Sequence, residues 1–473
     1  MRTWNKTLTI LAALAIATAG AACGSDDKDP VQNDGGSGGV GGTGGTGGTG
    51  GTGGTGEVGT RVNVTGDITS DTTWTANNTY ELKGRVFVKN GATLTIEPGT
   101  LIEGNDGTAL VITRGSKILA DGRADAPIVF TATDPDGDGK YPGDWGGLIL
   151  LGKAPLNVTG GVNSIEGFPA GSSTDIEYGG NDPHDDSGVL RFVRIEYAGW
   201  EFAPDEEINA LTLGGVGDGT TIEYVQTHLA ADDGIECFGG TVNLKHVVIT
   251  RADDDSLDWD LGWTGKVQFL AIQQEADVGN GGYEADNDGS DMDKSPRSKP
   301  TLYNVTMVGS GVAAGAAGKT QIGMILKEGT GGIIKNHVVT QFADIAVDVQ
   351  HAPTAALFAT GDLSITHSIF FGSNGGNDFV NTAVDDDSKD GAFDEGAVIM
   401  DAANQNRNVD PQLTDAMNLA APNFLPKAGS PALTGGATPP DDGFFDTSAT
   451  FVGAFGTENW MAGWTAFPKL PNE

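Results

Sequence analysis

The sequence predicts an all-β fold: a single right-handed parallel β-helix of roughly 10–12 coils with a cap at each end. The first observation behind this is an internal repeat. Residues 222–240 (IEYVQTHLAADDGIECFGG) and 244–262 (LKHVVITRADDDSLDWDLG) align without gaps, 22 residues apart. A unit that recurs at a fixed, short period covers its neighbour instead of enclosing a core of its own, so successive copies are expected to stack.

The second observation is a hydrophobic pattern, apolar-x-x-apolar-x-apolar, that recurs beyond these two copies. Its spacing is too tight for an amphipathic helix, and it breaks strand alternation once, as happens where a strand turns a corner. Such strands would stack at about 4.8 Å, with insertions near residues 197–210 and 275–300 leaving as loops. The pattern occurs at Leu190/Val193/Ile195, Ile222/Val225/Thr227, Leu244/Val247/Ile249, Val267/Leu270/Ile272 and Leu302/Val305/Met307, and more weakly at Ile334/His337/Val339 and Ile365/Ser368/Phe370.

A β-sandwich or a β-propeller is the alternative fold. A sandwich does not require residue-by-residue similarity at this period, and a propeller blade needs about 40–50 residues. Both are therefore weaker explanations of a repeat of 22 residues.

The N-terminus predicts export and anchoring. Residues 1–22 combine Arg2 and Lys6 with an apolar run and small residues directly before Cys23, which is typical of a lipoprotein signal peptide. Gly20 stands where an aliphatic residue is usual, so ordinary signal cleavage with an incidental cysteine stays open. We expect Cys23 to be lipidated and to hold the protein on a membrane in the cell envelope, at the outer membrane and exposed on the surface.

Four segments follow from composition. Residues 1–22 are the signal peptide, and 23–57 are the lipidated cysteine with a Gly/Thr-rich tether that cannot bury apolar area. Residues 58–409 form the β-helix, and 410–473 form its C-terminal cap. Trp74 within residues 58–84, together with Trp460 and Trp464, is a candidate for covering the two open ends.

The net charge of −37 excludes nucleic acid as a partner and favours divalent cations. Cys237 is the only cysteine besides Cys23, so the mature chain has no internal disulfide. We expect the protein to be a monomer.

Several phrases resemble a family of bacterial secreted or lipid-anchored right-handed parallel β-helix proteins. They are GRVFVKNGATLTIEPGTLIEG and ALVITRGSKILADGRADAPIVFTA near the N-terminus, DWGGLILLG and INALTLGG in the middle, and NVDPQLTD, NFLPKAGSPALTGG, TFVGAFG and NWMAGWTAFP near the C-terminus. The resemblance covers residues 60–473 and implies the fold. It implies little about activity, because fold alone does not define function.

Three acidic loops resemble the first half of a D-x-D-x-D-G calcium loop, in which alternate carboxylates converge on a hard cation. None has Glu at the twelfth position, although Asp144 and Glu395 lie close enough to substitute. Solvated acidic turns are the alternative. The candidate ligands are Asp134, Asp136 and Asp138 with Asp144; Glu284, Asp286 and Asp288; and Asp386 and Asp390 with Glu395.

A second acidic feature follows from the repeat itself. Carboxylates stack ten residues after the first position of the pattern, at Asp232, Asp254, Asp277 and Asp344, and Glu236 stacks with Asp258. Like charges about 4.8 Å apart repel each other and raise each other's pKa. Either a cation such as Ca²⁺ lies between them, as in β-helix pectate lyases, or one carboxyl is protonated, or the side chains splay into water.

An alternative interpretation is an enzyme whose active-site residues come from adjacent coils. Glu196 and His228 occupy equivalent positions, Asp232 and Asp254 follow them, and Trp200 and Trp263 lie nearby, as in the groove of a polysaccharide lyase or hydrolase. Asp232-Asp233-Gly234 is similar to the paired aspartates of polygalacturonases. The accompanying Gly-His-Gly and Arg-Ile-Lys segments of that family are absent, and Arg297 has no paired arginine of the pectate-lyase kind.

One further set is predicted to be structural. Phe192, Tyr224, His246, Phe269, Asn304, Asn336 and His367 recur two residues into each pattern. Aromatic and amide ladders of this kind stabilise coils by stacking and hydrogen bonding, whereas a metal would need its ligands on fewer coils.

The function we expect is a non-catalytic binding, adhesion or structural module that Ca²⁺ stabilises and that presents a long face to a glycan or protein ligand. The alternative is a polysaccharide lyase or glycoside hydrolase that uses Glu196, His228, Asp232 and Asp254.

Overall fold

A computed structural model of the chain describes residues 59–168, 173–202, 208–276, 278–311, 320–379 and 389–473. These residues belong to the second of two compact units, Gly56–Glu473. The signal peptide, Cys23 and the tether lie outside the described residues, as do Asp277 and Asp386. Within the part of the chain that is described, no helix is both long and apolar enough to span a bilayer.

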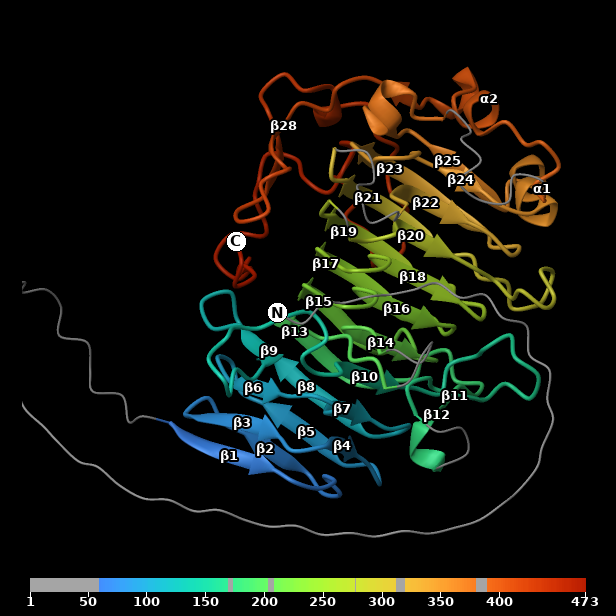
Figure 1. Cartoon of the computed structure of the whole chain (residues 1–473). Helices are drawn as coiled ribbons and strands as arrows, with labels where there is room; N and C mark the ends of the chain where they lie inside the picture. Colours follow the sequence, from blue (N-terminus) through green and yellow to red (C-terminus); the bar gives the residue numbers. More distant parts are fainter. Residues whose placement is uncertain (1–58, 169–172, 203–207, 277, 312–319, 380–388) are drawn as a thin grey trace, which may run out of the picture. The chain divides into compact units, whose positions relative to one another are not determined.

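The strands form two parallel sheets that wind into a right-handed β-helix (Figure 1), which confirms the predicted fold class. Sheet A runs in the order β1 (Thr60–Val64), β3 (Asn78–Leu82), β6 (Leu101–Gly104), β9 (Ile128–Ala132), β13 (Gly188–Glu196), β15 (Thr221–His228), β17 (Asn243–Thr250), β19 (Lys266–Gln273), β21 (Thr301–Val308), β23 (Gly332–Thr340), β26 (Ile369–Phe371) and β27 (Arg407–Asn408), with β2 (Thr72–Trp74), β5 (Thr93–Ile96), β8 (Lys117–Asp121) and β25 (Leu363–Thr366) paired beside this path. Sheet B runs in the order β4 (Arg85–Val88), β7 (Ala109–Ile112), β10 (Leu148–Leu151), β14 (Leu211–Gly214), β16 (Ile235–Phe238), β18 (Leu257–Asp260), β20 (Gly281–Ala285), β22 (Ile322–Leu326) and β24 (Asp348–Val349).

Each long strand of sheet A bends at one residue, which explains the break in the hydrophobic alternation. In β15 the bend is Tyr224, whose φ is 54°, and in β17 it is His246, whose φ is 56°. The N-terminal coils lack this one-residue bend: β8 and β9 are separate strands, and both pair with β13 on either side of Phe192. From β13 onward, therefore, one residue with a positive φ joins two strand segments that are separate in the N-terminal coils.

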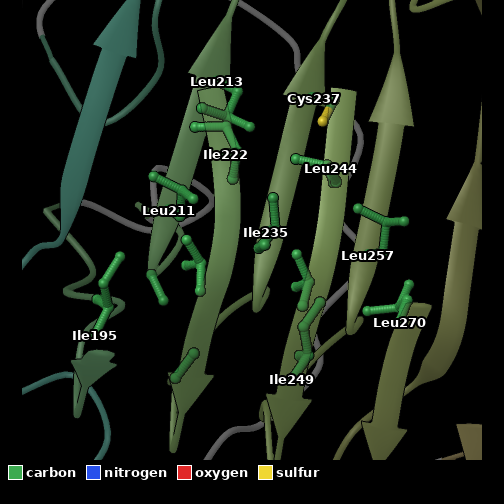
Figure 2. Packing of buried hydrophobic residues seen from close by; sticks show 14 of the residues in the cluster. Ile195, Leu211, Leu213, Ile222, Ile235, Cys237, Leu244, Ile249, Leu257 and Leu270 are labelled. Carbon is green, nitrogen blue, oxygen red and sulfur yellow. The ribbon is translucent and has the colours of Figure 1, made fainter. Parts of the chain in front are cut away.

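The predicted 22-residue stacking is confirmed by the strand register. Ile222 pairs with Leu244, and Val225 pairs with Val247. Figure 2 shows the apolar side chains of both sheets meeting inside the coils, among them Leu211, Ile235 and Leu257 of sheet B. Cys237 is fully buried there beside Trp259, as expected of an inert interior thiol.

The C-terminal end of the interior is covered by two helices that precede residue 410. They are α1 (Ala352–Thr360) and α2 (Glu395–Ile399), and Leu357 and Ile399 join the main apolar core. At the other end Trp74 stacks on Tyr80, with ring centroids 4.8 Å apart.

The residues expected to form the C-terminal cap lie elsewhere. Residues 431–473, here called the return segment, follow the hairpin β28 (Leu413–Asp415) and β29 (Asn423–Pro426) and lie along the outer face of sheet A, beside strands β13 to β23 (Figure 1). The amide of Asn336 in β23 binds Ala437, and Gln226 in β15 binds Ala466. Trp464 is therefore not an end cap, because its ring packs on the outer face of sheet A.

The outer face of sheet B has a separate cover. The described parts of residues 152–187 and 197–208, here called the cover loops, include β11 (Asn163–Ser164), η1 (Thr174–Ile176) and β12 (Glu177–Tyr178). Ile165 and Phe168 of these loops pack on Val111 and Ile149, which point outward from β7 and β10. The predicted insertion near residues 197–210 is part of this cover.

Candidate cation site on the outer face of sheet B

A row of outward-pointing residues crosses sheet B, one from each strand. Thr212, Glu236, Asp258 and Glu284 are in register on β14, β16, β18 and β20. Their neighbours along each strand point into the core, because successive side chains of a strand alternate between faces. The row continues the apolar positions Val111 and Ile149 on the same face, so carboxylates follow where hydrophobic side chains stop.

These carboxylates are buried although they point away from the core. Glu236 is 8% exposed, and Asp258 is 9% exposed. Burial raises the pKa of both carboxyls well above the ordinary value, and nearby charged carboxylates raise it further. Burial likewise raises the pKa of Asp260, which lies at the end of β18.

The turns before β16 and β18 add a second layer of carboxylates. Asp232 and Asp233 precede β16, and Asp254 and Asp255 precede β18 at equivalent positions. Asp233 is 7% exposed, and its Oδ1 accepts a hydrogen bond of 2.9 Å from the Asp255 N–H. Burial, followed by repulsion from Asp232 and then Asp258, raises the pKa of the Asp233 carboxyl.

Two sets of three carboxylates converge closely enough to hold a cation. One consists of Asp232, Asp233 and Asp254, and the other of Asp233, Glu236 and Asp258. Within each set the ligand atoms lie within 4.8 Å of one another. Oxygen atoms at this spacing suit a hard cation such as Ca²⁺, whose bonds to oxygen are about 2.3–2.6 Å long.

A single lysine neutralises the far end of the row. Lys327 Nζ lies 2.6 Å from Glu284 and 3.5 Å from Asp286. Burial nonetheless raises the pKa of Asp286 to about 8, against the opposing effect of Lys327. Asp258 Oδ1, Asp260 Oδ1 and Asp286 Oδ1 are buried oxygens without a hydrogen-bond partner.

The residues of the enzymatic reading do not share an open groove. Glu196 and His228 lie at the ends of β13 and β15, both buried, whereas Asp232 and Asp254 lie in the following turns. The His228 ring meets Thr250 Oγ1 at 2.7 Å through Nδ1 and the Pro468 carbonyl at 3.0 Å through Nε2. Burial lowers the His228 pKa to about 4, so the ring is neutral at pH 7.

Glu196 and Trp263, which belong to the same predicted enzymatic site, also have partners within the protein. Glu196 Oε1 accepts a hydrogen bond of 3.0 Å from Arg194, and burial raises the pKa of the Glu196 carboxyl. Trp263 is fully buried in the core, where its Nε1–H donates to the Val242 carbonyl. It therefore cannot line a groove, unlike the half-buried Trp200.

In the D-x-D-x-D-G loops, several of the described carboxylates make other contacts. Asp134 Oδ1 accepts from Gly139 N–H, and Asp144 Oδ2 accepts from Tyr141 N–H. Asp288 binds Lys294 at 2.5 Å, and Asp390 binds the Ala392 N–H. None of these loops contributes to the two converging sets found among the described residues.

Two other predicted ligands, Glu395 and Asp344, also belong to neither converging set. Glu395 begins α2 and accepts a hydrogen bond from Val349 N–H at 3.3 Å, and burial raises its pKa to about 7. Asp344 Oδ2 accepts from Gln321 N–H at 2.6 Å. Among the described members of the predicted column, carboxylates therefore converge only around the two central repeats.

Sequence reasoning missed the residue that joins the two sets, Asp233. The signal was present, because Asp233 aligns with Asp255 in the repeat just as Asp232 aligns with Asp254. Asn209, whose Nδ2 donates to Glu236 Oε2 at 2.5 Å, carries no charge, and its equivalence to Asp233 on the next coil appears only in the strand register, in which Leu211 pairs with Ile235. Only the fold places it beside the carboxylates.

The predicted ladder is structural. Phe192, Tyr224 and His246 stack on consecutive coils, with centroids 4.5 Å and 4.3 Å apart. Phe269 continues the stack 4.8 Å from His246. Trp464 meets Phe192 and Tyr224 edge-on at 6.0 Å, so the return segment covers the ladder.

Comparison with known proteins supports the fold. No curated protein and no solved structure shows significant similarity to the chain. One family model, described as a pectate-lyase-like beta helix domain, matches residues 66–465. This match spans nearly all of the coils, the cover loops and most of the return segment. The chain therefore belongs to the family of pectate-lyase-like β-helix domains.

Proposed function

We propose that the protein is a lipid-anchored, surface-exposed binding or structural module of the cell envelope, and that Ca²⁺ stabilises its β-helix. The observation that carries the non-catalytic part is the cover on sheet A. His228 is 1% exposed, and both of its ring nitrogens have partners. A general base needs an accessible nitrogen within reach of the substrate proton, and His228 offers none.

The calcium part of the proposal rests on the acidic face of sheet B. Burial, and after it repulsion from neighbouring carboxylates, raises the pKa of Asp233, Glu236 and Asp258, and a bound cation favours their ionised forms against both effects. The donor set is oxygen only, which suits Ca²⁺ better than a transition metal. Affinity in the range of about 10⁻⁴–10⁻³ M is typical of extracellular calcium modules.

Turnover assays separate a binding module from an enzyme. The purified protein is incubated with acidic and neutral polysaccharides, with and without Ca²⁺, and products and retained glycan are both measured. We expect glycan or protein retention without product release. Product release that Asp232→Asn abolishes would contradict the proposal.

Anchoring and display need their own test. Cells that express the wild type or Cys23→Ser are labelled with a fatty-acid probe and then treated with protease while intact. We expect label on the wild type alone, and cleavage of the wild type at the surface. An unlabelled wild-type protein would contradict the lipid anchor, and full protection from protease would contradict surface display.

A carbohydrate-active enzyme is the second candidate, and one observation favours it. Glu236 and Asp258 are adjacent carboxyls whose burial raises the pKa, and a carboxylic acid kept protonated beside a charged one is the usual basis of acid catalysis. For that candidate, Glu236→Gln and Asp258→Asn would abolish turnover while Asp255→Asn would not.

A further inference from the structure

The two converging carboxylate sets have one member in common, Asp233. One set reaches outward from it to Asp232 and Asp254 in the turns, and the other reaches along sheet B to Glu236 and Asp258. Asp233 Oδ1 accepts one hydrogen bond, from Asp255 N–H at 2.9 Å. A carboxylate has about four lone-pair sites, so Asp233 retains acceptor capacity toward both sets.

A second observation points to a ligand at the inner set: neutral oxygens around it lack hydrogen-bond donors. Thr212, directly paired with Glu236 in the sheet, is 1% exposed, and its Oγ1 has no partner. Asn209, whose amide nitrogen contacts Glu236, is fully buried, and its Oδ1 also has no partner. Asp258 Oδ1 is unpartnered as well. Buried oxygens without donors are costly, and a cation satisfies them where no N–H or O–H is available.

Charge decides between one cation and two. The two sets together hold five carboxylates, Asp232, Asp233, Asp254, Glu236 and Asp258, with a charge of −5 when all are ionised. One divalent cation leaves −3, whereas two leave −1. The inner carboxylates Asp233, Glu236 and Asp258 are buried, whereas Asp232 is half-buried and Asp254 is exposed. A cation in each set is therefore favoured, most strongly in the buried inner set, where uncompensated charge costs most.

Resting on the calcium binding proposed above, we propose that Asp233 bridges two Ca²⁺ ions, an outer one held with Asp232 and Asp254 and an inner one held with Glu236 and Asp258. Thr212 and Asn209 both lie beside Glu236, and their unpartnered Oγ1 and Oδ1 are the neutral oxygens available to the inner ion. Two ions that share one carboxylate lie about 3.5–4 Å apart in known two-metal centres.

Calcium stoichiometry tests the bridge. The full-length chain in detergent is depleted of metal, titrated with Ca²⁺ by calorimetry, and checked by equilibrium dialysis with metal analysis. We expect two Ca²⁺ per wild-type chain. Asp232→Asn removes the outer ion and Asp258→Asn removes the inner one, so each binds one Ca²⁺. Asp233→Asn weakens both sites at least about ten-fold, because affinity follows the number of charged ligands.

Asp255→Asn is the matched control. Asp255 occupies the equivalent position one coil later and is 1% exposed, yet it belongs to neither set. We expect it to keep two ions. If Asp233→Asn fails to fold, as judged by circular dichroism, the loss of one ion in each of the other two variants still decides the question.

The outcomes separate this inference from the proposal beneath it. A wild-type protein that binds one Ca²⁺ and is stabilised by it would overturn the bridge and leave calcium stabilisation intact. Two ions that survive Asp233→Asn with unchanged affinity would also overturn the bridge. No binding at millimolar Ca²⁺ would overturn both.

Discussion

The outer faces of the two sheets belong to the same coils, yet the polar groups on these two faces are satisfied in different ways. Sheet A presents rings and amides, and the return segment binds them through the chain's own carbonyls and indoles, as at Asn304 and Trp464. Sheet B presents carboxylates under the cover loops, and several of their buried oxygens have no donor. In a stacked repeat, side chains of one type recur on every coil and form a row along one face. The chemistry of that side chain decides whether other parts of the protein can satisfy the whole row.

The largest expected effect comes from opening the cover on sheet A. Trp464 is 1% exposed, and its Nε1–H donates to the Trp460 carbonyl at 2.8 Å. Replacing a buried tryptophan by alanine costs about 3–5 kcal/mol, so Trp464→Ala should lower the free energy of unfolding by that amount in urea. Met417→Ala, at a site that is 43% exposed, is the control and should have little effect. Equal losses would mean that the return segment does not stabilise the coils.

On sheet B the comparable change is removal of Ca²⁺. At 100 times the Kd, which is about 10–100 mM for the affinity proposed above, a ligand stabilises by about 2.7 kcal/mol per site, so chelation of Ca²⁺ at that concentration should lower the free energy of unfolding by at least that much. Asp258→Asn should reduce this difference, whereas Trp464→Ala should leave it unchanged. Identical melting temperatures in chelator and in millimolar Ca²⁺ would contradict the calcium proposal.

Acid should destabilise the sheet A face through its histidines. Burial lowers the pKa of His228 to about 4, below the value of 6.5 for an exposed imidazole, so the unfolded state takes up its proton first. This contribution to stability is present above pH 6.5 and is lost as the pH falls toward 4. At pH 5 the loss amounts to about 2 kcal/mol. Urea unfolding of wild type and His228→Gln at pH 7 and pH 5 should show a smaller acid loss in the variant.

The carboxylates of sheet B respond with the opposite sign. Burial raises the pKa of Asp286 to about 8, so in metal-free protein its contribution is greatest at low pH and is lost as the pH rises through about 8. Comparing His228→Gln with wild type cancels this contribution, because both proteins carry the same carboxylates. A variant with the same acid loss as wild type would show that His228 is not responsible.

A smaller effect is expected where the ladder changes from rings to amides. Asn336 is fully buried, has a φ of 57°, and exchanges hydrogen bonds of 2.8 Å and 2.7 Å with Ala437. Asn336→Gly should cost about 1–2 kcal/mol, because it removes these bonds and keeps the left-handed backbone. Asn336→Ala should cost about 1 kcal/mol more, since alanine is strained there. Equal unfolding midpoints for the two variants would contradict the backbone contribution.

The smallest effect is expected at the exposed loop that contains Asp136, which belongs to neither carboxylate set. Asp136→Asn should change the free energy of unfolding by less than about 0.5 kcal/mol and leave calcium stoichiometry at the wild-type value. Loss of an ion in this variant would restore the D-x-D-x-D-G loop as a calcium site.

The sequence alone predicted a large part of the candidate site. The repeat placed Asp232 next to Asp254 and Glu236 next to Asp258, and strand register joins these pairs as the alignment implies. It could not place Asn209 or Thr212, because the strand that carries Thr212 follows an insertion of different length. Nor could it show that Lys327, which directly follows β22 two coils beyond Asp258, binds Glu284.

The amino-acid sequence by itself determined the coil, because a period of 22 residues with one bend leaves few ways to bury the apolar positions. Only the tertiary structure decided what covers each face. The return segment contacts residues more than 200 positions away, as in the pairing of Gln226 with Ala466. No local pattern specifies such a contact, since it depends on where a long segment finds complementary side chains after the coils have stacked.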